Sequence, residues 1–511
     1  MSAPSTSVRP AGPTVTRRAA PADRSAVAMA VLIIMGSLAA GILAADAPLL
    51  TVAGASALLL GIAIVLRPDV ATLTTIAILY TNAAVVAVRF HGVPLFVGAF
   101  VPALLVVPLA RDLVVRRLPV VAPPMLGWMV VLLFIFLVSA LFSSDTSQSW
   151  DAVVIFVVEG FGLYFLIINV IRTPEMLRGA TWVLLISGAV ISVLAIHQTA
   201  TSNYDSNYLG FAQADSAIRT GETNLAGDIL QPRMAGPIGE TNRFAQTMLM
   251  LVPLGLFRMI GERSISLRVL AGLMTLAITL GVVLSFSRGG AVGLAALVLA
   301  LMVLRLVHTR HVVVLLVALA LILVAFPQYT NRITGLAEQG GFGDSTSTAV
   351  TDTSLLSRAT ETLAAALVMV DHPILGVGPA MFPVHYERYA QVVGILIRDD
   401  AAREAHNLYL GIGAEIGIPG LIVFLIIAGL TVRMILAARR ASITRRPDLE
   451  RLATPFLLAL LTYYVTGLFL HLSFGRFYWL MMAVAGAAAI ITLRETAADK
   501  ASDQGAASQS V

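Results

Sequence analysis

Arginine interrupts the apolar sequence where a bilayer makes an unpaired charge costly. Arg288 lies in the segment 285–290, Ser-Phe-Ser-Arg-Gly-Gly, between the apolar stretches 270–283 and 291–304. Those stretches predict two membrane helices joined by a very short turn, which would hold Arg288 at or just inside a membrane face. A charge there costs roughly 3 kcal/mol or more without an anionic partner. Because two glycines would let a bulky partner approach, we expect a site for a lipid-linked phosphate; an arginine extending to lipid headgroups is the simpler alternative.

A second arginine, Arg233, precedes a predicted helix within the Pro- and Gly-rich segment 231–245. Thr241 or Asn242 is expected to cap that helix through its side-chain oxygen. The helix N-terminus would point at the outer face and attract anions through its unpaired N–H groups and its dipole. Arg233 and Arg243 therefore strengthen the prediction of an anion site, although either could be a solvated loop charge.

His406 opens the segment 406–420, where a long outer loop is predicted to re-enter the membrane. A histidine at such a water-poor lip can act as a general base because imidazole titrates near working pH, although a lone interfacial histidine is usually structural. Asn407 follows it directly. Glu415 lies about two and a half helical turns deeper and could orient the site, balance its charge or pair with an arginine. Glu159, within another predicted span, is an intramembrane carboxylate and hence a functional candidate, or a structural partner for an arginine.

Other outer-face polar residues are individually weaker candidates: Asp46, His197, Arg358, Tyr386, Arg398, Arg403 and His471. The sequence has no Walker-type Gly-Lys loop, so ATP is not expected to drive the reaction. It has no clustered carboxylates or histidine pairs that would predict a metal site. We therefore expect no cofactor and no metal, with arginine supplying the positive charge.

Composition defines the elements that must position these residues. The 511-residue chain is 58% hydrophobic and 12% charged, against about 25% charged residues in soluble domains. A bilayer admits helix bundles or closed barrels, and non-alternating apolar runs of about 18–25 residues favour the bundle. The net charge of +5 comes from basic residues scattered through short loops, so it predicts membrane topology and not nucleic-acid binding.

The fold class expected is therefore all-α, a polytopic transmembrane bundle of about 12–14 spans. The approximate limits are 26–45, 48–66, 70–88, 94–110, 124–142, 151–171, 179–198, 243–260, 267–285, 289–307, 311–327, 407–432, 453–472 and 475–493. Lys and Arg in the short loops place both termini in the cytoplasm.

The predicted organisation has seven parts. They are a disordered cytoplasmic N-terminus (1–25), N-terminal transmembrane helices (26–198), an outer loop (199–242), central transmembrane helices (243–327), a long outer loop (328–406), C-terminal transmembrane helices (407–493) and a disordered cytoplasmic tail (494–511).

The two outer loops differ in character. The loop 199–242 is expected to hold little regular structure. The loop 328–406 contains an amphipathic stretch, Ser354 to Val370, with Arg358 and Glu361 on its polar side. We expect that helix along the outer membrane surface, followed by a tight Gly- and Pro-shaped turn. Because long ordered loops are usually functional, the chemistry is expected on the outer face.

Four segments in this order resemble the O-antigen ligase and O-antigen polymerase superfamily of bacterial inner-membrane proteins. They are 233–245, with Asn-x-Phe-Ala at a helix start; 284–294, with Ser-Arg-Gly-Gly; 358–382, with His-Pro-Ile-Leu-Gly-Val-Gly-Pro; and 406–420. Together they cover roughly residues 230–430. Before residue 230 the likeness is limited to a string of hydrophobic spans.

The resemblance implies an all-helical membrane glycosyltransferase of the C type that transfers a glycan from undecaprenyl diphosphate to an acceptor hydroxyl on the outer face of the cytoplasmic membrane, without a metal. Carried over by position, Arg233 and Arg288 would bind the diphosphate and His406 would be the base. Glu415 lies in the same motif with a less definite role. The implied partners are a lipid-linked oligo- or polysaccharide donor, a glycan, lipid or protein acceptor, and membrane lipids.

The implied mechanism rests on charge neutralisation. Arginine forks pair bidentately with phosphate oxygens, and preorganised cations stabilise the charge that grows on the leaving diphosphate. His406 would deprotonate the sugar hydroxyl, which attacks the anomeric carbon opposite the diphosphate, so inversion is expected.

Three other functions compete with ligation. A polymerase of the same superfamily uses the same donor, and the segments around Arg288 and His406 favour a ligase only slightly. A flippase for the lipid-linked glycan would show repeats and midplane charges; no internal repeat is evident, and only Glu159 is expected to lie deep. A non-catalytic scaffold would not require long polar outer loops ending in arginine and histidine.

Overall fold

The computed structural model describes residues 67–94, 98, 101–214, 233–306, 353–395, 403–471 and 475–509. The chain divides into two compact units, Met1–Val70 and Ala71–Val511, and nearly all described residues belong to the second. The expected N-terminal segment 1–25, the spans 26–45, 48–66 and 311–327, and the candidates Asp46 and Arg398 lie outside the described residues.

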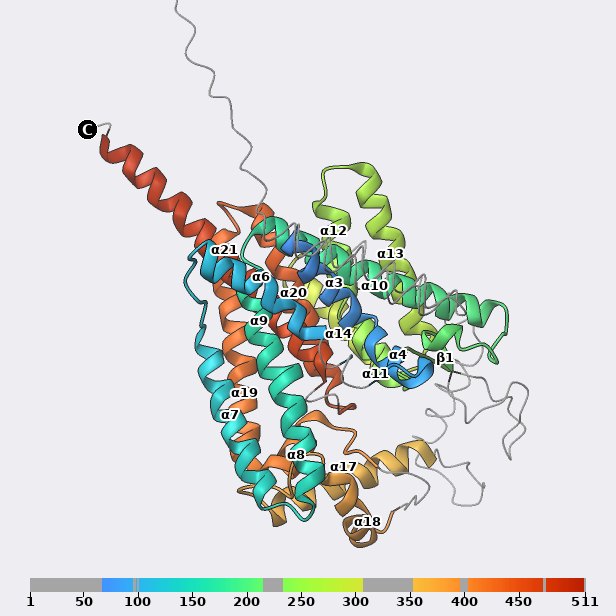
Figure 1. The fold of residues 1–511 in the computed structure, drawn as a ribbon. Helices are drawn as coiled ribbons and strands as arrows, with labels where there is room; N and C mark the ends of the chain where they lie inside the picture. The colour runs from blue at the N-terminus through green and yellow to red at the C-terminus, as the bar shows by residue number, and fades with distance from the viewer. Residues whose placement is uncertain are drawn as a thin grey trace, which may run out of the picture. The chain divides into compact units, whose positions relative to one another are not determined.

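Seven segments of the described chain are long and apolar enough to cross a membrane. They are α7 (Pro124–Leu141); α8 (Thr146–Ile155), η3 (Phe156–Gly162) and α9 (Leu163–Val170) taken together; α10 (Pro174–Ala200); α11 (Thr241–Leu249) with α12 (Val252–Gly261); α13 (Ile265–Leu284); α19 (Leu408–Ser442); and the larger part of α21 (Arg476–Gln509). An eighth is the pair α3 (Pro68–Tyr80) and α4 (Ala83–His91), bent by 57°. The all-α, polytopic membrane bundle is thus confirmed (Figure 1).

Other predicted spans coincide with shorter or more polar helices. The apolar helix α14 (Arg288–Val303) has 16 residues. Helix α20 (Pro447–Thr466) carries Asp448 and Glu450 in its first turn. The described part of 94–110 forms η1 (Val101–Leu105) and α6 (Val106–Ala110), followed by η2 (Arg111–Val115). The count of about 12–14 spans therefore stays a prediction.

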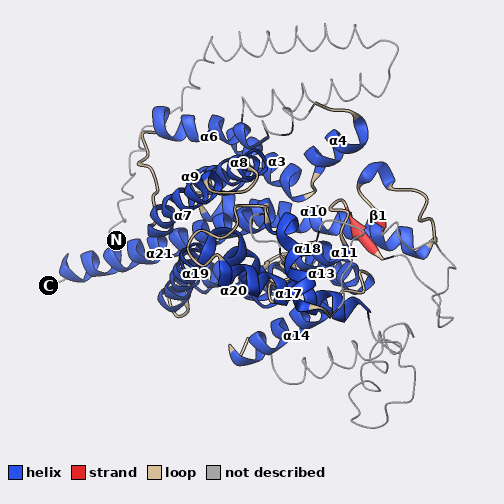
Figure 2. Ribbon diagram, turned by 90° about the horizontal axis from the view of Figure 1, so that it is seen from below, coloured by secondary structure: helices blue, strands red, loops and turns tan. Residues whose placement is uncertain are grey.

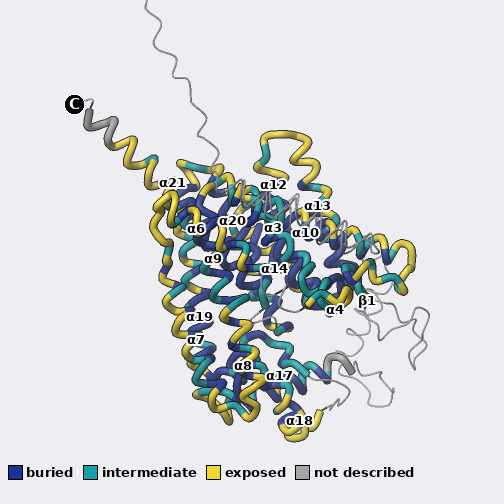
Figure 3. The backbone as a smooth tube through the Cα atoms, in the orientation of Figure 1, coloured by how far each residue is buried: buried dark blue, intermediate teal, exposed yellow. Residues whose placement is uncertain are grey.

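Local sequence sets the helix starts. Thr173 caps α10 by accepting a hydrogen bond from the Met176 amide, and Pro174 follows at the first helical position, where its missing N–H removes no helical bond. Large apolar side chains, among them Phe134, Val190 and Leu273, remain exposed on the helices. Figure 3 shows exposed positions along the outer helices of the bundle. Such surfaces suit contact with lipid.

The described part of the loop 199–242 holds only short regular elements, in line with the expectation, whereas the tail is helical where disorder was expected. The loop 199–242 holds η4 (Tyr208–Gly210) and a short antiparallel ribbon of β1 (Gln213–Ala214) and β2 (Met234–Gly236), seen in Figure 2. Residues 494–509, expected as a disordered tail, continue helix α21. Arg446 lies 2.9 Å from Asp499 and Arg445 lies 3.2 Å from Asp503, so side chains around the α19–α20 turn bind the helical extension.

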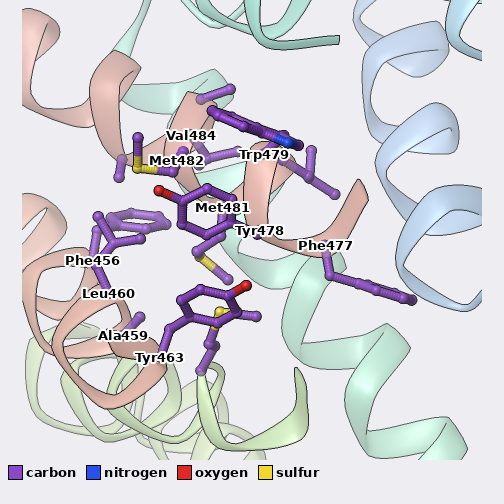
Figure 4. Close-up of a cluster of buried hydrophobic side chains, with 14 of the residues drawn as sticks. Phe456, Ala459, Leu460, Tyr463, Phe477, Tyr478, Trp479, Met481, Met482 and Val484 are labelled. Carbon is purple, nitrogen blue, oxygen red and sulfur yellow. The ribbon is translucent and has the colours of Figure 1, made fainter. Parts of the chain in front are cut away.

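An aromatic core holds the end of α20 against the start of α21. The rings of Tyr463 and Tyr478 stack with centroids 4.7 Å apart (Figure 4). Trp479 meets Phe156 edge-on, with ring centroids 5.5 Å apart. These side chains are almost completely buried. Because aromatic pairs combine large buried areas with preferred geometries, this core fixes the short turn that follows α20.

Helix α17 (Thr353–Asp371) buries part of the side that was expected to be polar. It packs against α18 (Phe382–Val393) and α19, at the end of α7 and α8 (Figure 1). Its buried side chains include Ser357, Glu361, Ala364 and Val368, whereas Val370 is exposed. The side expected to be polar, which holds Glu361, is therefore partly buried. Small alanines allow close packing here, and Glu361 meets cationic partners inside the protein.

The Gly- and Pro-shaped turn after α17 interlocks with a break in α19. Ile416 and Gly417 leave helical geometry, and the freed carbonyls of Ala414 and Glu415 accept hydrogen bonds from the Val377 and Gly378 amides at 3.0 and 2.9 Å. The backbones meet so closely that a Cβ on Gly376, whose φ is +66°, would lie 2.3 Å from the Glu415 carbonyl carbon. Glycine is therefore required on this side of the contact.

Substituting Gly376 with alanine should destabilise the protein. The left-handed backbone alone costs an L-residue roughly 1–2 kcal/mol, and the overlap with Glu415 adds to this. The thermal unfolding midpoint of detergent-solubilised Gly376→Ala should fall clearly. Gly429→Ala is the matched control, because a Cβ there meets nothing within 4 Å and alanine favours the interior of α19 by about 1 kcal/mol. Equal midpoints for the two variants would contradict the interlock.

Candidate active site

Arg233 binds the turn that precedes Arg288. Its Nε donates to the Ser285 carbonyl at 3.1 Å, and its Nη2 lies 3.4 Å from the Phe286 carbonyl and 3.5 Å from Oδ1 of Asn242. Phe286 has a positive φ of 52°, which helps to reverse the chain between α13 and α14. Segments more than fifty residues apart in sequence are thus joined at one place.

Asn242 and Ser287 connect the N-terminal ends of α11 and α14. The Ser287 hydroxyl donates to Asn242 Oδ1 at 2.9 Å and accepts from the Gly290 amide at 3.2 Å, so Ser287 caps α14. Arg288, half-buried, is the first residue of that helix. Arg233 thus binds the turn that leads directly to Arg288 at the start of α14.

The glycines after Arg288 serve helix packing. A Cβ on Gly289 would lie 3.7 Å from Leu470, and one on Gly293 would lie 2.3 Å from Leu249 and 2.5 Å from Thr466. We expected Gly289 and Gly290 to admit a bulky partner. Instead, side chains of α11, α20 and the segment after α20 approach this face of α14, so the glycines permit close helix packing.

The expected cap of α11 is wrong. Neither Thr241 nor Asn242 caps the helix; the Glu240 carboxylate does so, accepting from the amides of Asn242 at 2.9 Å and Arg243 at 2.6 Å. A carboxylate satisfies two otherwise unpaired donors and is favoured by the helix dipole, which explains its preference over the neutral side chains.

The segment 467–471, which follows α20, joins the two halves of the site. Its Gly467 carbonyl accepts from the Leu408 amide at 2.7 Å, and its Leu468 carbonyl accepts from Asn407 Nδ2 at 3.2 Å. His471, at its end, lies edge-on to His406 with ring centroids 5.3 Å apart. Since Leu470 of the same segment packs beside Gly289, the start of α19 and the start of α14 share this neighbour.

The partners of His406 define which ring nitrogen is basic. Its Nδ1 lies 2.8 Å from Oε2 of Glu361 and 3.1 Å from the Glu404 carbonyl oxygen. Both neighbours are acceptors, so Nδ1 carries the proton and Nε2 keeps its lone pair. The side chain is 21% exposed. This is the protonation pattern that a histidine base requires.

His471 is a neutral neighbour of this base. Its Nε2 contacts Nη2 of Arg243 and lies 3.5 Å from Oε1 of Glu404. Burial lowers the pKa of His471 well below the ordinary value of 6.5, and the positive charge of Arg243 lowers it further. Because a guanidinium can only donate, the Nε2 of His471 accepts.

The remaining sequence candidates have other surroundings. Asn407 caps α19 by accepting from the amides of Tyr409 and Leu410. Glu159, in η3, lies 3.4 Å from Arg476, as a structural ion pair would. Glu415 accepts hydrogen bonds from the Ala380 and Phe382 amides.

Four weaker candidates complete the comparison with the sequence. Arg358 is a half-buried residue of α17, and Arg403 lies 3.8 Å from Glu361. His197 contacts the Tyr208 hydroxyl at 2.7 Å. Tyr386 is buried in the core between α17 and α18. Arg403 thus lies beside Glu361, the carboxylate that contacts His406.

Sequence reasoning missed three acidic residues that organise the site. Glu240 caps α11, Glu404 lies 3.5 Å from Arg243, and Glu361 contacts His406. Glu404 stands two positions before the candidate base, and Glu361 stands four positions after Ser357, whose hydroxyl donates to it at 3.0 Å. The spacings of two residues from Glu404 to His406 and of four from Ser357 to Glu361 are the sequence signals that could have pointed to these acidic residues.

The arrangement concentrates positive charge and a base where three helices begin. Helices α11, α14 and α19 start here, and helix N-termini attract anions. Arg233, Arg243 and Arg288 add permanent charge. Among the described residues, no group of three or more His, Cys, Asp or Glu side chains could hold a metal ion. The chemistry available from these side chains is anion binding beside a histidine base.

A multi-pass membrane bundle with this site corresponds to a known class of transferase. Residues 273–425 match the family model described as O-antigen ligase, which confirms the resemblance drawn from the sequence. The chain thus carries an O-antigen ligase domain, and such a domain implies a transferase enzyme. Arg288, Glu361, His406 and Glu415 lie within the match, whereas Arg233 lies before it. None of the curated proteins matches the chain.

His471 should make the protein sensitive to acid. Below pH 6.5 the unfolded chain protonates this histidine while the folded protein does not, so the free energy of unfolding falls by up to about 1.4 kcal/mol per pH unit. His471→Gln, which keeps an acceptor for Arg243, should lose less stability between about pH 7 and pH 5.5 in thermal unfolding. His372→Gln, at an exposed position, should behave like the wild type. Identical pH dependence in His471→Gln would contradict the buried neutral histidine.

Proposed function

We propose that the protein transfers a glycan from undecaprenyl diphosphate to an acceptor hydroxyl on the outer face of the cytoplasmic membrane. The observation that carries the proposal is one continuous set of contacts. Arg233 binds the turn before Arg288, Asn242 links that turn to α11, and Arg243 of α11 contacts His471 beside His406. The family match supports glycan transfer as the chemistry.

Arg288 and Arg233 bind the diphosphate in this proposal. Diphosphate leaves readily only when its developing charge is neutralised, and guanidinium groups remain charged at any relevant pH. Arg233 is preorganised by the carbonyls of Ser285 and Phe286, so little reorganisation accompanies the reaction. Arginine supplies the charge that a divalent metal supplies elsewhere, and the transfer is metal-independent.

His406 acts as the general base. Its Nε2 takes the proton of the acceptor hydroxyl while the hydroxyl oxygen bonds to the anomeric carbon. The bond from that carbon to the diphosphate oxygen breaks, and its electron pair leaves with the diphosphate. Attack opposite the leaving group inverts the anomeric configuration. Asn407, Arg243 and Asn242 hold the neighbouring helix ends in place, and Glu415 and Glu159 stabilise the structure around the site.

Loss of either charged group should abolish transfer without preventing membrane insertion. Arg288→Ala removes charge stabilisation worth about a hundredfold or more in rate, and His406→Ala removes a base worth about 10²–10⁴-fold. Arg288→Lys should retain an intermediate rate, since lysine keeps the charge and lacks the planar fork. The measurement is product formation by purified protein in nanodiscs with a synthetic undecaprenyl diphosphate oligosaccharide and an acceptor.

Two control variants isolate the site from general damage. Arg263→Ala changes an exposed arginine between α12 and α13, and His91→Ala changes an exposed histidine of α4; both should retain wild-type transfer. Full activity in Arg288→Ala or His406→Ala would remove the assigned roles. New glycosidic bonds made by purified wild-type protein also exclude a flippase or a scaffold, which form none.

The acceptor separates a ligase, which we favour, from a polymerase of the same superfamily. In a deletion strain, long free polymer accumulating on the lipid carrier indicates a missing ligase, because polymerisation has proceeded without transfer. Single repeat units on the carrier indicate a missing polymerase. Mass analysis of the envelope glycans distinguishes the two results.

A further inference from the structure

Glu361 is a buried carboxylate surrounded by donors. Its side chain is 1% exposed on the inward face of α17. Oε1 accepts a hydrogen bond from the Ser357 hydroxyl at 3.0 Å and lies 3.8 Å from Nη1 of Arg403, while Oε2 lies 2.8 Å from Nδ1 of His406. A buried charge is costly unless it is paired, so the packing of α17 requires these contacts.

The same contact controls the imidazole. A carboxylate oxygen 2.8 Å from Nδ1, beside the Glu404 carbonyl oxygen at 3.1 Å, favours the proton on that nitrogen and leaves the lone pair on Nε2. The backbone of His406 has a positive φ of 46°, uncommon for a residue other than glycine. Asn407, which caps α19 next to it, holds this turn. His406 is therefore constrained through both its backbone and its ring.

We propose that Glu361 is a positioning residue that orients His406 and stabilises its protonated form during transfer. This inference rests on the proposed function, because it assigns a second residue to the same proton transfer. The proton moves from the acceptor hydroxyl to Nε2 of His406, and the electron pair of the broken bond leaves with the diphosphate. Glu361 gains no proton; its negative charge stabilises the imidazolium until the proton passes to solvent or to the diphosphate.

The helix that carries Glu361 comes from the long loop between α14 and α19. The base lies at the start of α19, and α17 packs directly on α19. Packing of α17 on α19 therefore brings the Glu361 carboxylate to the His406 ring. The long loop thus contributes to the site through Glu361, which faces inward from α17.

Isosteric and shortened variants of Glu361 test the inference in purified full-length protein. Glu361→Gln keeps the shape and removes the charge, and its amide can favour the wrong imidazole tautomer; kcat should fall about a hundredfold or more. KM for the lipid-linked donor should stay within about twofold, because Glu361 does not touch the diphosphate. Glu361→Asp keeps the charge and should recover part of the lost kcat.

Glu387→Gln is the matched control. Glu387 is an exposed glutamate of α18, the helix packed against α17, and its substitution should leave kcat and KM unchanged. Thermal unfolding midpoints of all the variants establish that they fold. Glu361→Gln with kcat within about threefold of wild type overturns the inference. Equal losses in Glu361→Gln and Glu361→Asp with a raised KM also overturn it, since they indicate a structural role.

The activity of His406→Ala distinguishes a failure of the positioning role from a failure of the proposed function. An inactive His406→Ala together with a fully active Glu361→Gln removes only the positioning role. A fully active His406→Ala removes the proposed function itself, whatever Glu361 does.

Discussion

Pairing of the Arg233 guanidinium with the carbonyls of a tight turn is the interaction on which this structure depends. A guanidinium in or beside hydrocarbon needs partners, and Arg233 finds them in the carbonyls of Ser285 and Phe286. The same turn leads to Arg288 at the N-terminus of α14, a position that favours an anion. Arg233 thus stabilises the tight turn next to the arginine that we propose as its partner in diphosphate binding.

A second constraint is the segment 467–471, which touches both parts of the site. The stacked Tyr463 and Tyr478 hold α20 against α21, and the segment 467–471 follows α20 directly. It receives the first amide of α19 and the side chain of Asn407, and it brings His471 to His406. Aromatic packing deep in the bundle is thereby connected to the orientation of a base at its edge.

The sequence predicted the helical membrane class because apolar length is a local signal, and it predicted the family resemblance from short motifs. It could not predict partners that tertiary packing selects. Glu361 was assigned to the polar side of an amphipathic helix, and periodicity cannot show that this side meets another element; the residue is buried against His406. Glu240 displaced the expected caps Thr241 and Asn242 because a carboxylate accepts two amides. The role of Gly376 could not be predicted, because it depends on the break in α19 at Gly417, forty-one positions later.

The most direct measurement is an electron cryomicroscopy structure of the protein in nanodiscs with undecaprenyl diphosphate bound. The account predicts both phosphates against the guanidinium groups of Arg233 and Arg288, with His406 Nε2 facing the same space and Nδ1 still on Glu361. Diphosphate bound away from both arginines, or Arg288 and His406 found on opposite membrane surfaces, would contradict it.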